Sequence, residues 1–479
     1  MRSLSGIDGA FLHLETPDTP MHVGSLHLFE PTPAGRFAAQ LERRLRERLD
    51  AAPILRRRLA SLPFDLANPV WVDDDHVDLE RHLQRTSLPA PGTHAQLEVL
   101  AARLHAEPLD RARPLWRIVV IDGLESGEVA LYFQIHHAML DGQASVVLAR
   151  TLYDLAPRPA RTRPAPTADA AHAEHPSIGA LALEALRHDA GQYLDLVRHS
   201  ADAVRTLAGM AADSALGRTR ESGARASVFA PKTALNVPIT GERGFAAGSL
   251  PLDALKRIAA AHDAKLNDVV LALSSGVLRR WLEGHGGIPE EPLTAWVPVS
   301  LRDPGDEAYT TQATMILVGL ATHLADPVER LLAIRDSANE AKALARRARD
   351  VLPLDFPTLG VPWILHAGAW LYGRLRLADA VAPLGNLVVS NVAGPQAPLY
   401  LAGTRMRTYW PMSIVEHGLG LNVTVMSYDG AMGFGFTTAR SAVPDARELT
   451  LALGEAFDEL AGVGHGVGRR RPAVAGGRR

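Results

Sequence analysis

The sequence predicts an α/β protein made of two domains. At 479 residues, the chain is longer than one hydrophobic core usually organises. Alternating strand and helix patterns fill residues 1–156 and return over residues 236–462. Residues 157–235 join them, as a linker rich in Pro, Ala and Arg over 157–176 followed by a helical pattern over 178–216. Residues 463–479 predict a disordered basic tail.

The first domain contains a buried strand that leads into a polar turn. Residues 129–135 are mostly apolar, and successive side chains of a strand point to opposite faces. One face is strongly apolar and is expected to face the core. Residues 144–155 then change to helical spacing and stop before Pro157. The residues between strand and helix therefore lie where a rigid scaffold often carries a functional loop.

The second domain has periodic elements of its own. Apolar residues recur at helical spacing at Val270, Leu273, Val277, Leu278 and Trp281. Gly284 closes this helix, Asn267 occupies the position of an N-cap, and Asp268 complements the helix dipole. Short strands are predicted at residues 295–299, 387–389 and 422–427. Asp429-Gly430 after the last strand predicts a hairpin turn.

The most informative motif is HHAMLDG at residues 136–142. Histidine exchanges a proton near neutral pH, and the constellation is what a general base needs when the nucleophile is a substrate hydroxyl or amine. The parity of the strand continues to His137, which is therefore expected to face inward as the base. His136 then supports its neighbour or packs toward solvent. Asp141 and Gly142 predict a tight turn that holds the ring.

Two other interpretations of this motif stay open at this point. The histidines could be satisfied polar residues at a strand end, with Asp141 as the cap of the following helix. A metal site is the third interpretation, but His137 and Asp141 have no third ligand nearby, and the chain contains no HExxH spacing. We expect no metal.

Composition narrows the function classes. The net charge of −3 gives no overall basic field, so a nucleic-acid partner is not expected. The chain has no cysteine, which removes disulfides, thiolate metal sites and a Cys nucleophile, and suits a reducing cytosol. The first residues open no apolar secretory segment. A cytoplasmic protein is expected.

One uncharged stretch, residues 356–373, tests that expectation. It is barely long enough to span a bilayer, and Pro357, Pro362 and His366 interrupt it. A buried helix, the lining of an acyl-chain tunnel, or an interfacial anchor explains it better than a membrane span. The basic tail offers a second contact with an anionic membrane surface, with a solvated tail as its default state.

These motifs together resemble the bacterial bifunctional wax ester synthase/diacylglycerol acyltransferases. The resemblance covers most of the chain, and HHxxxDG alone is shared with a superfamily that includes chloramphenicol acetyltransferase and peptide-forming condensation domains. The blocks that narrow it, in chain order, are LSGID at 4–8, TPMHVG at 19–24, PLWR at 114–117, HHAMLDG at 136–142, NDVVLA at 267–272, PVSLR at 298–302, SNV at 390–392 with Gly394-Pro395, and SYDG at 427–430.

The resemblance implies two chloramphenicol-acetyltransferase-like domains, each a mixed sheet with flanking helices, and an active-site channel between them. It implies direct transfer of a fatty acyl group from acyl-CoA to a long-chain alcohol or to diacylglycerol, in wax ester or triacylglycerol synthesis. Acyl-CoA is a co-substrate, and no bound cofactor is expected. The lipid substrates imply contact with a membrane or lipid-droplet surface. The oligomeric state, a homodimer included, is left open.

The resemblance also distributes roles among the candidate residues. His137 is the base, in agreement with the parity argument. Asp141 is structural and pairs with a distant arginine, for which Arg302 is the candidate, although Arg302 beside Asp303 also suits a surface position. Asn267 is a candidate donor to the oxyanion, with capping as its other role. Gly142 lets backbone or substrate come close, or is a plain turn glycine.

One departure and two rival functions complete the prediction. Residues 310–312 read TTQ where many relatives have a Gly-Asn pair, which puts acceptor or chain-length preference in doubt. The first rival is a condensation-like acyltransferase acting on carrier-bound substrates, but the chain shows no carrier segment. The second is a non-catalytic lipid-binding protein, which would not need an intact HHxxxDG motif.

Overall fold

The computed structural model describes most of both predicted domains. The described residues are 2–4, 6–33, 35–49, 52–61, 68–139, 152–158, 229–300, 313–348 and 361–462, with residues 179, 183 and 187. Several sequence predictions lie outside them: the helix from residue 144 up to 151, most of the linker and of the helical pattern over 178–216, Asp141, Gly142, Arg302, residues 310–312 and the basic tail. The division at residues 156 and 236 stays a prediction.

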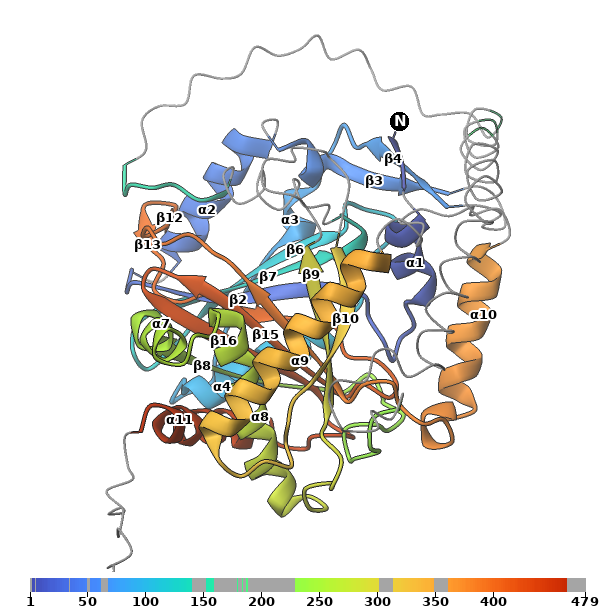
Figure 1. Cartoon of the computed structure of the whole chain (residues 1–479). Coiled ribbons are helices and arrows are strands. Elements are labelled where there is room, and N and C mark those ends of the chain that lie inside the picture. Colours follow the sequence, from blue (N-terminus) through green and yellow to red (C-terminus); the bar gives the residue numbers. More distant parts are fainter. Residues whose placement is uncertain are drawn as a thin grey trace, which may run out of the picture.

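The first sheet has five strands in the order β14-β2-β7-β6-β5 (Figure 1). Its strands are β2 (His22–Phe29), β5 (Leu83–Ser87), β6 (Trp116–Asp122), β7 (Val129–His136) and β14 (Trp410–Met412). Neighbouring strands run antiparallel except β5 and β6, which are parallel. The central strands β2 and β7 pair over their whole length, with His22 opposite His136. This register brings the motif histidines to one end of the sheet.

Strand β7 is buried on both faces. Val129, Leu131 and Ile135 belong to one apolar cluster, whereas Ala130 and Tyr132 belong to another. The alternation predicted from the sequence is therefore confirmed, but each face meets its own core. The apolar face is confirmed to face a core, and the opposite face is buried in a second apolar cluster, which the sequence did not reveal.

Short helices and a small sheet surround the first sheet. The helices are α1 (Gly6–Leu14), α2 (Arg36–Arg48), α3 (Leu79–His82) and α4 (His94–Ala106). Beside them lie a three-stranded sheet and a 3-10 turn, formed by β1 (Arg2–Ser3), β3 (Arg57–Ala60), β4 (Val70–Asp73) and η2 (Pro53–Arg56). Helix α4 begins with a capping box, in which Thr93 Oγ1 accepts from Gln96 N (3.2 Å) and Gln96 Oε1 accepts from Thr93 N (2.7 Å).

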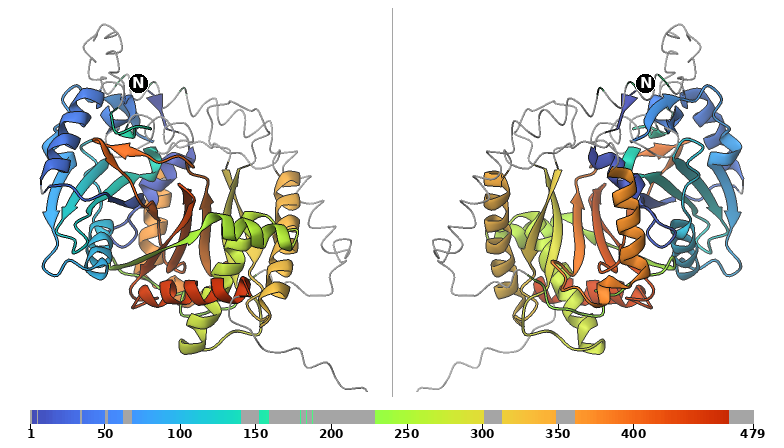
Figure 2. Two further views of the ribbon diagram at one scale, coloured as in Figure 1. Left: turned by 90° about the vertical axis from the view of Figure 1, so that its left-hand side faces the viewer. Right: turned by 90° about the vertical axis from the view of Figure 1, so that its right-hand side faces the viewer.

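The second sheet has six strands in the order β10-β9-β11-β15-β16-β8. They are β8 (Arg243–Pro251), β9 (Thr294–Ser300), β10 (Ala313–Gly319), β11 (Leu387–Val392), β15 (Leu421–Tyr428) and β16 (Ala431–Ala439). The helices around them are α7 (Leu252–Ala261), α8 (Leu266–Gly284), α9 (Pro327–Ala348) and α11 (Arg447–Leu460). Helix α10 (Val361–Arg374) lies apart from this sheet and contacts α1. Figure 2 shows these later elements, green to red, grouped beside the earlier ones, blue to cyan.

Local sequence signals account well for this second half. The three predicted strands are β9, β11 and β15, and the predicted helix is α8, which ends at Gly284 as expected. Asp429 and Gly430 both have positive φ, 43° and 80°, in the two-residue turn between β15 and β16. Positive φ at both central positions is what a type I′ hairpin requires. The predicted hairpin is confirmed.

The described part of the uncharged stretch forms most of α10, which lies beside α1 (Figure 1). Within the described ranges, no helix is both long and apolar enough to cross a bilayer. The structure shows a helix over residues 361–373, but the interpretation as a buried helix is wrong, because Ile364, Trp370 and Leu371 are largely exposed. The tunnel lining and the interfacial anchor stay predictions.

Strand β14 belongs to the first sheet although it lies in the C-terminal half of the sequence, which the sequence did not predict. It comes from the C-terminal half of the chain but pairs with β2 of the first sheet, with Trp410 opposite Leu26. It also packs against β16 so closely that a Cβ atom on Gly435 would lie 1.8 Å from the carbonyl oxygen of Pro411. This short strand is thus one of the elements that join the two halves, together with the packing of α4 on β8.

We predict that Gly435→Ala destabilises the fold, because the added methyl group overlaps the β14 backbone. The expected loss is about 1–3 kcal/mol, the usual range for an overpacked core. Urea denaturation measures it. Gly454→Ala is the matched control in α11, where a Cβ meets nothing within 4 Å, and it should gain about 0.5–1 kcal/mol. Equal stability of the two variants would contradict the close contact.

Candidate active site

The motif histidines sit at the junction between β7 and a 3-10 turn, η4 (His137–Met139). The His136 amide donates to the carbonyl oxygen of Leu115 (3.0 Å), and the His137 amide donates to that of Met21 (2.9 Å). The strand therefore ends at His136. His137 is the first residue of the turn, and the strand parity that predicted its direction does not extend to it.

The His137 ring stacks on Phe11 of α1, with 3.9 Å between the ring centroids and 20° between the planes. Its Nδ1 atom is buried and has no hydrogen-bond partner among the described residues. Burial lowers the pKa of His137 to about 4. The imidazole is therefore the neutral, proton-accepting form at neutral pH.

His136 is only 1% exposed, and both of its ring nitrogens face polar groups. Nδ1 accepts a hydrogen bond from the amide of Ala138 (3.1 Å), so this nitrogen carries no proton. The proton must then be on Nε2, which lies 3.3 Å from Oε2 of Glu15. The alternative that His136 faces solvent is wrong, because β2 and α1 cover it.

Glu15, directly after α1, is the residue that the sequence did not reveal. Its Oε2 accepts from the amide of Met21 (3.0 Å), and its Oε1 accepts from Nε and Nη2 of Arg111 (3.1 and 2.9 Å). Burial by itself raises the pKa of Glu15, but its close contact with His136 and the charge of Arg111 outweigh burial and lower the pKa to about 2. In the sequence, the only indication of a role for Glu15 is its position between the family motifs at residues 4–8 and 19–24.

A second polar cluster lies behind the turn. Nε2 of His22 contacts the carbonyl oxygen of His105 (2.7 Å), and Nδ1 of His105 contacts the hydroxyl of Tyr132 (2.8 Å). Burial lowers the pKa of His22 well below its ordinary value and that of His105 to about 4. Both rings are neutral, so they add no cationic charge beside the turn.

Asn267 does not cap α8 as expected. The helix begins at Leu266 after Lys265, and Oδ2 of Asp268 accepts from the amide of Lys265 (2.8 Å). Asn267 lies one residue inside the helix, and its Oδ1 accepts from Nδ2 of Asn391 on β11 (3.4 Å). The capping role is therefore wrong, and its role as an oxyanion donor stays a prediction. So do the roles of Asp141, Gly142 and Arg302, which lie outside the described residues.

A pocket of about 390 Å³ is lined by Met21, whose carbonyl oxygen accepts from the His137 amide, although no residue of the turn itself lines it. Its lining residues come from three places in the chain: Leu14, Thr19, Met21, Gly368, Ala369, Tyr372, Glu416 and His417. Met21 both lines this pocket and binds the His137 amide. Burial raises the pKa of Glu416, and Nδ1 of His417 accepts from the Ile239 amide (3.0 Å). The pocket is thus mixed in polarity and lies between α1 and α10.

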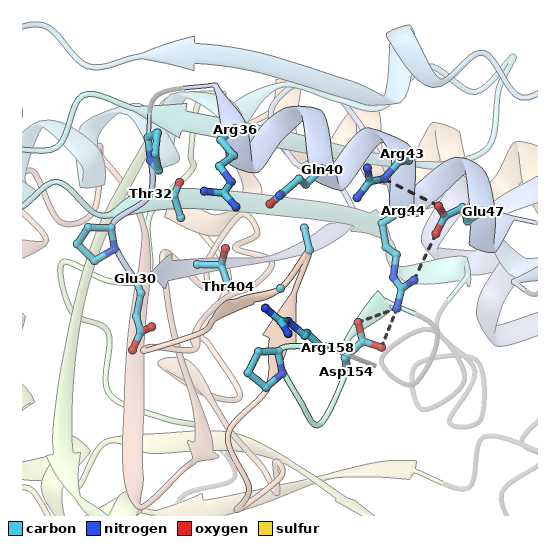
Figure 3. Close-up of a pocket in the computed structure, with 15 residues that line it drawn as sticks. Glu30, Thr32, Arg36, Gln40, Arg43, Arg44, Glu47, Asp154, Arg158 and Thr404 are labelled. Carbon is cyan, nitrogen blue, oxygen red and sulfur yellow. Dashed lines mark hydrogen bonds and ion pairs between the residues drawn. The ribbon is translucent and has the colours of Figure 1, made fainter. Parts of the chain in front are cut away.

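A larger pocket of about 590 Å³ lies at the other end of β2, beside Glu30 (Figure 3). His136 faces the first residue of β2, so this pocket is about 23 Å from it along the strand. Several arginines line it, and Arg44 pairs with Asp154 (3.2 Å) and with Glu47 (3.3 Å). This pocket is therefore distant from the candidate active site, and Arg44 in its wall is already paired with carboxylates. No cluster of metal-binding side chains occurs in the described part of the chain.

Comparison with known proteins decides the family. Residues 4–270 match the wax ester synthase/diacylglycerol acyltransferase catalytic domain, and residues 310–461 match the C-terminal domain of the same family. The chain belongs to the wax ester synthase/diacylglycerol acyltransferase family. It is therefore an acyltransferase, as the motifs predicted.

Individual relatives agree with this family. A protein of Mycobacterium tuberculosis H37Rv named as a diacylglycerol O-acyltransferase is 37% identical over 463 residues, covering 95% of this chain and 99% of that one. The solved wax ester synthase/diacylglycerol acyltransferase of Marinobacter aquaeolei VT8 is 30% identical, with a TM-score of 0.65 and coverage of 96% and 100%. The predicted α/β fold class is therefore confirmed for this chain.

A more distant likeness concerns the fold alone. The starter condensation domain of rhizomide synthetase, solved with C8-CoA, has a TM-score of 0.55 at 15% identity and covers 96% of this chain and 94% of that one. The wax ester synthase/diacylglycerol acyltransferase family thus shares its two-sheet architecture with condensation domains, as the HHxxxDG motif implied.

We predict that the Glu15 carboxylate stabilises the folded state in a pH-dependent way. Because its pKa falls from 4.5 to about 2 on folding, it contributes about 3 kcal/mol at neutral pH. This contribution is complete above the pKa of the unfolded chain and is lost as the pH falls through 4.5 toward 2. Urea denaturation of wild type and Glu15→Gln should show a gap that shrinks by about 1 kcal/mol between pH 7 and pH 3.5.

The same substitution at an exposed carboxylate, Glu455→Gln in α11, is the control. Its contact with Arg280 is solvated, so the change in stability should be below about 1 kcal/mol. A constant gap between wild type and Glu15→Gln over this pH range would contradict the lowered pKa.

Proposed function

We propose that the chain transfers a fatty acyl group from acyl-CoA to the hydroxyl of a long-chain alcohol or of diacylglycerol, with His137 as general base. The single observation that supports it most is a neutral imidazole held on a fixed turn at the end of a buried strand. A base must be unprotonated at the working pH, and burial keeps His137 in that state. Family membership supports the substrate class.

The proposed reaction is one direct transfer. His137 takes the proton of the acceptor hydroxyl as its oxygen attacks the thioester carbonyl carbon. The tetrahedral intermediate collapses, the carbon–sulfur bond breaks, and the imidazolium returns the proton to the CoA thiolate. The products are an ester and free CoA. The chain has no cysteine and no G-x-S-x-G segment, so no enzyme nucleophile is assigned. Asp141 is retained as the proposed structural partner of Arg302.

The acceptor is proposed to approach between α1 and α10. Leu14, which lines the smaller pocket, is one helical turn from Phe11, on which His137 stacks. Gly368, Ala369 and Tyr372 of α10 form the opposite wall. This path leads from the surface of α10 toward the turn. It suits an apolar acceptor with a polar end, because Glu416 and Thr19 line it beside apolar side chains.

The outer face of α10 is proposed to rest on a lipid surface. Ile364, Trp370 and Leu371 are 72%, 53% and 45% exposed, and they fall at helical spacing on one side. The Arg374 guanidinium lies over the Trp370 ring, 5.4 Å from its centroid. A tryptophan beside a cation at the end of an apolar face is typical of interfacial helices. A cytoplasmic protein bound peripherally to membranes or lipid droplets would meet its acceptor there.

We predict that His137→Ala abolishes ester formation. General base catalysis contributes about 10²–10⁴-fold in rate, so kcat should fall by that factor or more. Release of CoA thiol from acyl-CoA, measured with hexadecanol or diacylglycerol as acceptor, reports the activity. Circular dichroism should stay as in wild type, since the ring leaves only its stack on Phe11. Wild-type turnover by this variant would remove His137 from the mechanism.

The same assay separates the rival functions. Ester formation with free alcohols supports the proposed activity. Turnover only with an aminoacyl carrier protein would favour a condensation-like enzyme, and binding of lipid without thiol release would favour a non-catalytic protein.

We predict that Ile364→Glu combined with Leu371→Glu weakens lipid binding. Two charges replace apolar side chains on the outer face of α10, so binding to phosphatidylcholine vesicles that contain diacylglycerol should fall about ten-fold or more. Sedimentation with vesicles measures it, and activity on a water-soluble short-chain alcohol should stay unchanged. Leu451→Glu, on the exposed side of α11, is the control and should bind as wild type. Equal binding by all three proteins would contradict the proposed contact.

A further inference from the structure

We infer that Glu15 is a positioning residue for the reaction, whose carboxylate fixes the turn that presents His137 and holds His136 in one tautomer. This inference rests on the proposed role of His137 as base. It concerns a residue outside the HHxxxDG motif and 121 positions before His136 in the chain, in a loop between α1 and β2.

The first connection runs through Met21. Oε2 of Glu15 accepts from the Met21 amide (3.0 Å), and the Met21 carbonyl oxygen accepts from the His137 amide (2.9 Å). The peptide groups on both sides of the Met21 Cα are therefore fixed, one by Glu15 and the other by the turn. The backbone nitrogen of His137 is held by a residue that Glu15 anchors.

The second connection runs through His136. Nε2 of His136 lies 3.3 Å from the same Oε2 atom, a close polar contact whose geometry is not that of a hydrogen bond, and Nδ1 accepts from the Ala138 amide (3.1 Å). A carboxylate presents only acceptor atoms, so its negative charge at this distance favours the tautomer with the proton on Nε2. The other tautomer would place an N–H of His136 against the N–H of Ala138. Two successive amides of η4, those of His137 and Ala138, thus depend on one carboxylate.

Arg111 keeps this carboxylate ionised and oriented. Its two contacts occupy Oε1, which leaves Oε2 for Met21 and His136. Glu15 is 9% exposed, so the charge is held in a largely dry place where an apolar side chain would also fill the space. An apolar residue would accept no hydrogen bond, however. The carboxylate is needed for its direction, because a base displaced by about 1 Å loses about 10²-fold in rate.

The test compares Glu15→Gln with wild type in steady-state acyl transfer at pH 7. The amide keeps the size of the side chain but presents one acceptor in place of two, so it cannot satisfy Arg111, Met21 and His136 together. We expect kcat to fall about 10- to 100-fold, while the KM values for acyl-CoA and for alcohol change less than about two-fold. A merely structural role would lower the amount of folded enzyme without this split.

A spectroscopic readout checks the tautomer itself. In protein labelled with ¹⁵N-histidine, the ¹⁵N shifts of His136, assigned with a His136→Gln sample, should show a proton on Nε2 and none on Nδ1. In Glu15→Gln the two tautomers should become mixed. Gly276→Ala serves as the destabilised control, because a Cβ there would lie 2.9 Å from the Ala456 side chain between α8 and α11, away from the turn; its kcat and its His136 shifts should match wild type.

The outcomes separate this inference from the proposed function. If His137→Ala is inactive but Glu15→Gln keeps wild-type kcat, or loses no more kcat than Gly276→Ala, the role of Glu15 is overturned and the base stands. An unchanged His136 tautomer in Glu15→Gln also overturns it. If His137→Ala retains activity, the proposed function itself fails.

Discussion

The contact between the buried Glu15 carboxylate and the His136 imidazole ties the end of β7 to the loop before β2. Three separate parts of the chain meet there: the segment after α1, Arg111 before β6, and the turn that follows β7. A charge removed from water must be compensated on every side, and here each carboxylate oxygen has its own partners. The His137 ring stacks on Phe11 of α1, and the His137 amide is held by the carbonyl oxygen of Met21.

The position of this turn in the sheet depends on both halves of the chain. β2 pairs with β7 on one edge and with β14 on the other. Since β14 also packs on β16 of the second sheet, the strand that faces the motif histidines is held between the two halves. The candidate active site therefore lies on a sheet to which both halves of the chain contribute strands.

The sequence pattern predicted correctly those features that depend on neighbouring residues alone. Asp429-Gly430 forms its turn because both residues tolerate positive φ, and α8 follows its apolar stripe to Gly284. Patterns could not show that β7 is covered on both faces, since alternation gives parity but not what packs on each side. Nor could they find Glu15, whose partners lie far away in sequence. Asn267 was misplaced by a shift in the helix start, which propensity resolves poorly.

Burial acts in opposite directions on the two groups that matter most. It lowers the pKa of His137 to about 4, whereas Glu15 remains a carboxylate because His136 and Arg111 outweigh the same burial. In the proposed mechanism, a base with so low a pKa takes a proton from an alcohol less readily, so positioning must supply much of the rate. Its imidazolium, once formed, is a stronger acid than a free imidazolium and returns the proton readily to a thiolate. The proposed direct transfer therefore suits a base that holds its proton only briefly.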